Sequence, residues 1–165
     1  MAKKKNLSEV TQVHLREPGR VRIAVVTSSW NPEVTGVLEQ GAVAYLSEQG
    51  ITPGNILVEK VPGSYELPLA ARLMLNRGDI DGVVCLGCII QGETRHFEFI
   101  AQAVAHGIME VNLQATAPVS FGVLTTDTHQ QALDRAGGKH GNKGIEAAAA
   151  VVSMLALKQK METTL

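Results

Sequence analysis

The polar residues with the clearest chemical potential follow the apolar run GVVCLGCII at residues 82–90. Glu93, Thr94, Arg95 and His96 come next, where a helical pattern begins. The positive end of a helix dipole disfavours a charged imidazolium, so His96 is a candidate proton acceptor. Free backbone N–H groups at such a helix start favour an anion, phosphate above all. A structural histidine on an ordinary helix capped by Thr94 is the alternative that these residues leave open.

A second candidate for anion binding is the run DRAGGKHGNKG, residues 134–144. It combines four glycines with Arg135, Lys139 and Lys143. We expect a loop that bends easily and presents positive charge to an acidic or phosphorylated ligand. A solvated basic turn between two helices is the alternative. The sequence leaves open whether this run meets His96 within one subunit or only across a subunit interface.

Aromatic side chains are rare, at 4% of the chain. Three of them, Trp30, Tyr65 and Phe121, lie in or near segments where strands are expected to end. In a core built mainly from Val, Ile, Leu and Ala, this clustering favours a pocket for a flat ring. Aromatic side chains that merely close the top of a sheet are the alternative.

Cys85 and Cys88 have the CxxC spacing of redox and zinc motifs. Both lie inside an apolar run with strand character, and the chain has no second cysteine pair to complete a zinc site. We therefore interpret them as buried free thiols, and we expect no metal site and a reducing, cytoplasmic location.

Charge and hydropathy give no reason to expect nucleic acid or a membrane as a partner. The net charge is −1, and no apolar run approaches the ~20 residues of a membrane span. The basic patch at residues 3–5 is followed by no apolar segment, so we expect no signal peptide.

The elements that must position these residues alternate between strand and helix. Strands are predicted at residues 21–28, 55–61, 80–90 and 118–126. Helical patterns lie at 31–50, with Asn31 as N-cap and Gly50 as stop, and at 66–78, 97–108, 129–137 and 142–160. Near-continuous apolar strands are typical of parallel sheets that are covered on both faces.

This order predicts a three-layer α/β/α sandwich, a doubly wound fold around a four-stranded parallel sheet. Ligands of such sheets bind beyond the carboxyl ends of the strands, where the candidate residues are expected. We expect an exposed arm over residues 1–20, one domain over 21–160 and a tail over 161–165.

The last predicted helix is apolar around more than half of its circumference. One small sheet could hardly cover all of its apolar residues, which are Ile145, Ala148, Ala149, Val151, Val152 and Leu155. We therefore expect burial against another subunit, and hence a homo-oligomer.

Four ordered segments, GSYELP, LGCIIQGETRHFEFI, FGVLTTDTHQQALDRAG and GNKGIEAA, resemble the 6,7-dimethyl-8-ribityllumazine synthase family of riboflavin biosynthesis. The similarity covers about Val21 to Lys158. It implies a flavodoxin-like fold and condensation of 5-amino-6-(D-ribitylamino)uracil with 3,4-dihydroxy-2-butanone 4-phosphate, without metal or organic cofactor. It also implies pentamers with active sites between adjacent subunits, further assembly into decamers or icosahedral shells of sixty chains, and riboflavin synthase as a candidate partner.

The resemblance also assigns roles to individual residues. It implies that the ribitylaminouracil is bound by Trp30, Ser64, Tyr65, Glu66, Cys88, Ile89 and Ile90, with Phe121 from the neighbouring subunit. It places Glu93, Thr94 and the neighbour's Arg135 at the butanone phosphate, His96 at the proton transfers, and Lys139 and Lys143 near the site. Trp30 stands where the family usually has Phe, and Gln91 where it often has a basic residue.

Three other functions remain open at this point. The same aromatic pocket suits a flavin-binding or storage protein, although stacking alone needs neither His96 nor Arg135. A structural shell protein would need no site residues. Riboflavin synthases built on this fold are the most serious competitor, and because they use no phosphate substrate, phosphate release discriminates.

Overall fold

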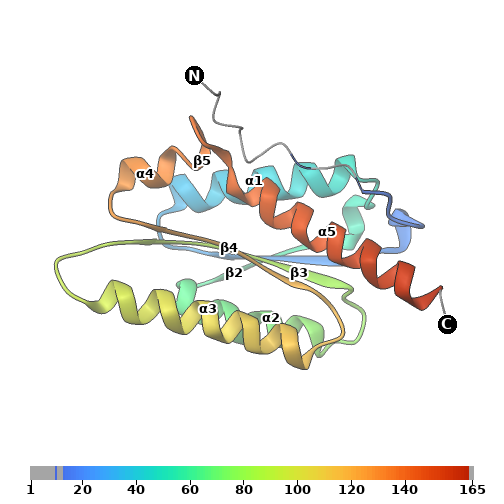
Figure 1. Ribbon diagram of the computed structural model, residues 1–165. Helices are drawn as coiled ribbons and strands as arrows, with labels where there is room; N and C mark the ends of the chain where they lie inside the picture. The colour runs from blue at the N-terminus through green and yellow to red at the C-terminus, as the bar shows by residue number, and fades with distance from the viewer. Residues whose placement is uncertain (1–9, 11–12, 164–165) are drawn as a thin grey trace, which may run out of the picture.

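A four-stranded, fully parallel sheet runs through the centre of the molecule in the computed structural model, which describes residue 10 and residues 13–163 (Figure 1). In chain order its strands are β1 (Ile23–Ser28), β2 (Ile56–Val61), β3 (Gly82–Ile90) and β4 (Val119–Thr126), and their order in the sheet is β2-β1-β3-β4. The four predicted strands are thus confirmed. The two central strands are almost entirely buried, as their continuous apolar runs predict.

Helices cover both faces of the sheet, which confirms the predicted three-layer sandwich (Figure 1). One face carries α1 (Pro32–Glu48), α4 (His129–Leu133) and α5 (Lys143–Glu162). The other carries α2 (Leu67–Leu75) and α3 (His96–Gln114). Each face has its own apolar cluster of Val, Leu, Ile and Ala side chains. Short 3-10 helices lie at Pro18–Arg20, Pro53–Asn55 and Ser64–Glu66.

The ends of α1 follow the sequence signals in position but not in every contact. Gly50 has φ 87° and stops the helix, with the Ile51 N–H donating to the Leu46 carbonyl at 3.2 Å. Asn31 occupies the N-cap position, but its side chain makes no capping bond. Its Nδ2 instead donates to the Cys88 carbonyl of β3 at 3.4 Å, which ties the strand-to-helix corner to the neighbouring strand.

The expectation that α5 needs a second subunit to bury its apolar residues is wrong, because α1 of the same chain and the sheet cover most of them. Ala148, Val151 and Val152 are each at most 1% exposed within the single chain. The cause is a close approach between α1 and α5: Asn142 caps α5 by accepting from the Gly144 N–H at 2.8 Å, and its Nδ2 donates to the Val37 carbonyl of α1. The burial of this helix therefore gives no argument for a second subunit.

The run at residues 134–144 is not the irregular loop that its glycines suggest. It forms a small antiparallel hairpin of β5 (Ala136–Gly138) and β6 (Gly141–Asn142). Two of its glycines, Gly137 and Gly141, have φ values of 97° and 75°, which other residues adopt only at a cost.

The predicted exposed arm holds for Arg16, Glu17, Gly19 and Arg20 but is wrong at Leu15. Leu15 is buried in the core cluster of the α1–α5 face. The Arg16 backbone N–H donates to Gln159 Oε1 at 2.9 Å, and Gln159 Nε2 donates back to the Arg16 carbonyl at 3.1 Å. The basic patch at residues 3–5 lies outside the described residues.

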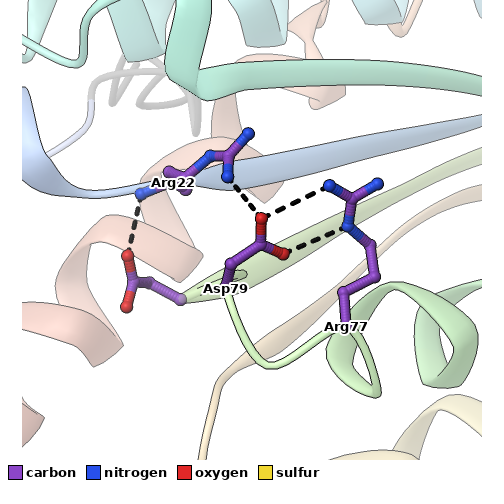
Figure 2. A network of polar contacts seen from close by, with 4 residues as sticks. Arg22, Arg77 and Asp79 are labelled. Carbon is purple, nitrogen blue, oxygen red and sulfur yellow. Dashed lines mark hydrogen bonds and ion pairs between the residues drawn. The ribbon is translucent and has the colours of Figure 1, made fainter.

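An ion-pair network holds the sheet at the amino ends of its strands, at the edge opposite the predicted site (Figure 2). Asp79 accepts from the guanidinium groups of both Arg22 and Arg77. Hydrogen bonding to Arg77 is the main reason that the pKa of Asp79 lies below its ordinary value. The Arg22 N–H donates to the Asp81 carboxylate at 2.8 Å. Among the described residues, no helix has the length and apolarity to cross a membrane.

Candidate active site

A cavity of about 560 Å³ opens at the carboxyl ends of β1, β2 and β3. This is the edge where ligands of parallel sheets bind. Its walls contain many of the residues singled out by sequence: Trp30, Ser64, Tyr65, Glu66, Cys88, Ile89, Ile90, Thr94 and His96. Three segments far apart in the chain therefore converge here, as the sequence predicts.

The two aromatic side chains of the cavity are presented to it rather than buried beneath it. Trp30 is 68% exposed and Tyr65 is 62% exposed, so neither closes the top of the sheet. The Trp30 ring lies against the backbone of Gly63, where an added Cβ would be 3.6 Å from Cε3 and Cζ3 of the indole. The cavity therefore offers flat apolar faces to a planar ligand.

The turn over Ser64–Glu66 is held by its own side chains and by the sheet below it. Glu66 Oε2 accepts from the Gly63 N–H at 2.9 Å, so this carboxylate shapes the turn. The Ser64 side chain packs directly on Gly87 of β3, where a Cβ would overlap its Oγ. Because Gly87 has no side chain, the Ser64–Glu66 turn can approach β3 closely and form one wall of the cavity.

The start of α3 differs slightly from the expectation. The helix begins at His96, and Glu93–Arg95 form the turn before it rather than its first residues. Thr94 Oγ1 accepts a long bond of 3.4 Å from the His96 N–H, and Arg95 at the N-cap position makes no side-chain capping bond. The first turn is exposed at His96 and Glu98, and the His96 bond is long, so the positive dipole end of α3 is open to an anion.

Both cysteines are buried and free, as predicted. Burial raises the pKa of Cys85 to about 12. Burial, with a smaller contribution from the charge of Glu33, raises the pKa of Cys88 to about 11. Both thiols are therefore protonated near neutral pH, and Cys88 contributes an uncharged wall. In the described part of the chain no three His, Cys, Asp or Glu side chains are grouped to hold a metal ion.

Phe121 and Arg135 line a different cavity, of about 420 Å³, along the edge strand β4. The prediction that Trp30, Tyr65 and Phe121 share one pocket is therefore wrong within a single chain. The Arg135 guanidinium is oriented by its own segment, because Nη1 donates to the Gln131 carbonyl at 3.0 Å. The structure thus separates the predicted site residues into two groups.

The remaining predicted residues lie outside the first cavity. Lys143 lines the second cavity and pairs with Glu146 at 2.7 Å. Lys139 lines neither of the two cavities and pairs with Asp134 at 2.7 Å. Glu93 is exposed and does not line the first cavity, although its neighbours Gly92 and Thr94 do.

Sequence reasoning missed one polar pair at this edge. Nε2 of His129, the first residue of α4, lies 2.6 Å from Oε1 of Glu33, in the first turn of α1. No periodicity or motif joins two residues this far apart in the sequence, so only the fold reveals the contact.

Comparison with known proteins identifies the family of the chain. A sequence model of 6,7-dimethyl-8-ribityllumazine synthase matches residues 20–159. The chain belongs to this family. A 6,7-dimethyl-8-ribityllumazine synthase of Cytophaga hutchinsonii is 52% identical over 152 residues, which cover 92% of this chain and 95% of the relative.

Other relatives with the same name are nearly as similar. That of Phocaeicola vulgatus is 40% identical over 159 residues, covering 96% of this chain and 95% of its own. The 6,7-dimethyl-8-ribityllumazine synthase of Thermus thermophilus is 47% identical over 137 residues, which cover 83% of this chain and 87% of the relative. The range matched by the family model, residues 20–159, spans the residues that line both cavities.

Proposed function

We propose that the protein condenses 5-amino-6-(D-ribitylamino)uracil with 3,4-dihydroxy-2-butanone 4-phosphate, giving 6,7-dimethyl-8-ribityllumazine, inorganic phosphate and water. One observation carries the proposal: in a chain of this family, Trp30, the Ser64–Glu66 turn and the His96 end of α3 line one cavity at the carboxyl edge of the sheet. This reaction is the penultimate step of riboflavin biosynthesis.

The cavity suits the uracil substrate in shape and chemistry. The exposed indole of Trp30 provides a face for ring stacking. The strand end at Cys88–Ile90 brings backbone groups and apolar side chains to the ring edge. The turn at Ser64–Glu66 forms the wall along which the ribityl chain extends, with Tyr65 open to it. No cofactor is needed, because both substrates carry the reacting groups.

The phosphate substrate lies at the start of α3 in this proposal. First-turn N–H groups and the helix dipole bind the phosphate, next to Thr94. The substrate amine attacks the ketone, and loss of water gives an imine. His96 takes up and returns the protons of these steps, phosphate leaves from the carbon chain, and ring closure with loss of a second water completes the lumazine. Positioning of two reactive molecules supplies much of the acceleration.

We further propose that Arg135 and Phe121 complete the site of a neighbouring chain, in a homopentamer with active sites between subunits. Their separate cavity on the edge strand supports this arrangement. Exposed apolar side chains offer surface for subunit contacts: Leu69 and Leu73 on α2, and Phe99, Met109 and Leu113 on α3, all at least 56% exposed. Assembly into decamers or icosahedral shells, a cytoplasmic location and contact with riboflavin synthase belong to the same proposal.

The test is to mix the purified protein with both substrates and to follow lumazine absorbance and inorganic phosphate together. We expect one phosphate for each lumazine. His96→Ala should slow turnover without abolishing it, and Arg135→Ala should raise the KM for the phosphate substrate severely. Arg20→Ala is the matched control, because it removes an exposed arginine that lines neither cavity.

Two of the alternatives have outcomes of their own when lumazine or riboflavin is added to the protein in place of the two substrates. Tight binding of lumazine or riboflavin without turnover would replace the proposal with a flavin-binding protein. Consumption of lumazine without phosphate release would indicate a riboflavin synthase. Unchanged kinetics of Arg135→Ala would refute the role of this residue.

A further inference from the structure

The Glu33–His129 contact joins two helices that each carry part of the proposed site. Glu33 lies in the first turn of α1, directly after the corner formed by Trp30 and Asn31. His129 is the first residue of α4, and Arg135 follows that helix. Both side chains are about half exposed, and their Nε2–Oε1 distance is 2.6 Å. An ordinary surface pair of this kind contributes little to stability, so its location is what matters.

The corner next to Glu33 turns the chain from β1 into α1 at a left-handed residue. Asn31 has φ 55° and ψ 56°, a left-handed conformation that asparagine adopts more readily than most residues, and its carbonyl accepts from the Val34 and Thr35 N–H groups, both at 2.9 Å. Its side chain makes only a long bond of 3.4 Å to the Cys88 carbonyl. The carboxylate of Glu33 also acts on Cys88, since its charge contributes to the raised pKa of that thiol. Glu33 itself does not line the first cavity, but it follows Asn31, which does, by two residues in the first turn of α1.

The other end of the contact is coupled to Arg135 through a short, internally bonded segment. Thr128 Oγ1 caps α4 by accepting from the Gln131 N–H at 3.2 Å. The Arg135 N–H donates to the Ala132 carbonyl, and its guanidinium donates to the Gln131 carbonyl, both at 3.0 Å. A shift of His129 would therefore displace Arg135 as well.

We propose that Glu33 and His129 are positioning residues: their contact holds the Trp30 corner of one site and the Arg135 segment of the second cavity in a fixed relation. This inference rests on the proposed function, in which Trp30 serves its own chain and Arg135 a neighbour. The pair then links two active sites through one chain. Hydrogen bonds from its own backbone and from His129 hold the pKa of Glu33 below its ordinary value, so its carboxylate accepts the bond at neutral pH.

The experiment uses Glu33→Gln, His129→Gln, the double variant, and the exchanged pair Glu33→His with His129→Glu. Glu39→Gln is the matched control, because Glu39 also lies on α1 and pairs with Lys60 of β2 at 2.6 Å, away from both cavities. Unfolding curves establish that each variant is folded. If the exchanged pair does not fold, the two single variants and the double variant decide alone.

The first readout needs no substrate. Trp30 is the only tryptophan of the chain, so time-resolved anisotropy with excitation that spares tyrosine separates the motion of this corner from the tumbling of the whole protein. We expect lower anisotropy in both single variants, no further loss in the double variant, recovery in the exchanged pair and no change in Glu39→Gln. Unchanged anisotropy in the single variants would overturn the inference whatever the protein catalyses.

The second readout is steady-state kinetics. Each single variant should raise the KM of both substrates about two- to fivefold, the range that the coupling energy of an exposed ion pair converts to. The kcat should change little, because neither residue touches the reacting atoms. Effects that simply add in the double variant, or a lowered unfolding temperature with unchanged KM, would refute the positioning role. A wild-type protein without lumazine synthesis would instead refute the proposed function.

Discussion

Two variants that are each defective should regain activity when they assemble together. His96 lines the first cavity, and Arg135 lines the second one on β4. In the proposed arrangement a complete site takes His96 from one chain and Arg135 from its neighbour. His96→Ala and Arg135→Ala then damage different parts of the site. A mixed assembly then contains some sites built from an intact cavity and an intact arginine.

The size of the recovery follows from the geometry of a ring. A site is intact when an Arg135→Ala chain supplies the cavity and the next chain, carrying His96→Ala, supplies the arginine. With equal amounts and random order each condition holds for half of the chains, so about one quarter of the sites are intact. At a three-to-one ratio the fraction falls to about three sixteenths, so the yield should peak at equal amounts.

The assay is co-expression of the two variants with different affinity tags, followed by purification on both tags and measurement of lumazine formation. A low concentration of the phosphate substrate keeps the background of Arg135→Ala small, and the residual turnover of His96→Ala is measured separately and subtracted. Arg135→Ala co-expressed with itself under both tags is the control. Activity no higher than the mean of the separately purified variants would show that His96 and Arg135 serve one site within one chain, or that they are not site residues.

Three further predictions concern the fold. In urea unfolding, Gly144→Ala should lower the free energy of unfolding by about 1–3 kcal/mol, because the new methyl group overlaps a backbone carbonyl of α1. Gly36→Ala should raise it by about 0.4–1 kcal/mol, because no atom lies within 4 Å of the new group. Equal stability of the two variants would contradict the close packing of α1 on α5. Because the pKa of Asp79 is lowered in the folded protein, its carboxylate stabilises the fold at neutral pH, and this stabilisation is lost as the pH falls below about 4. Asp79→Asn should therefore lower the free energy of unfolding at pH 7 and lower it progressively less in acid. A difference that does not depend on pH would exclude this ion pair. Because burial raises the pKa of Cys85 to about 12 and of Cys88 to about 11, a thiol reagent at pH 8 should label them only after unfolding, and rapid labelling of the folded protein would contradict their burial.

Patterns that repeat locally made the sheet and its site edge predictable from the sequence. The run at residues 82–90 is apolar at nearly every position, which is the pattern of a central parallel strand that is covered on both faces. Gly50 ends α1 because the left-handed conformation after a helix costs glycine little. Once the strand order is parallel, Trp30, Tyr65 and His96 must gather at the carboxyl edge, because all strands end there.

Contacts between distant segments were decided only by the tertiary structure. The Asn31 side chain was expected to cap its own helix but donates to Cys88, since a neighbouring strand offers an acceptor that no local pattern reveals. The burial of α5 depends on how closely α1 approaches it. The contact between Glu33 and His129, and the placing of Arg135 in a second cavity, depend on where whole elements lie. Side-chain spacing encodes local structure, whereas the meeting of two surfaces depends on the packing of the entire chain.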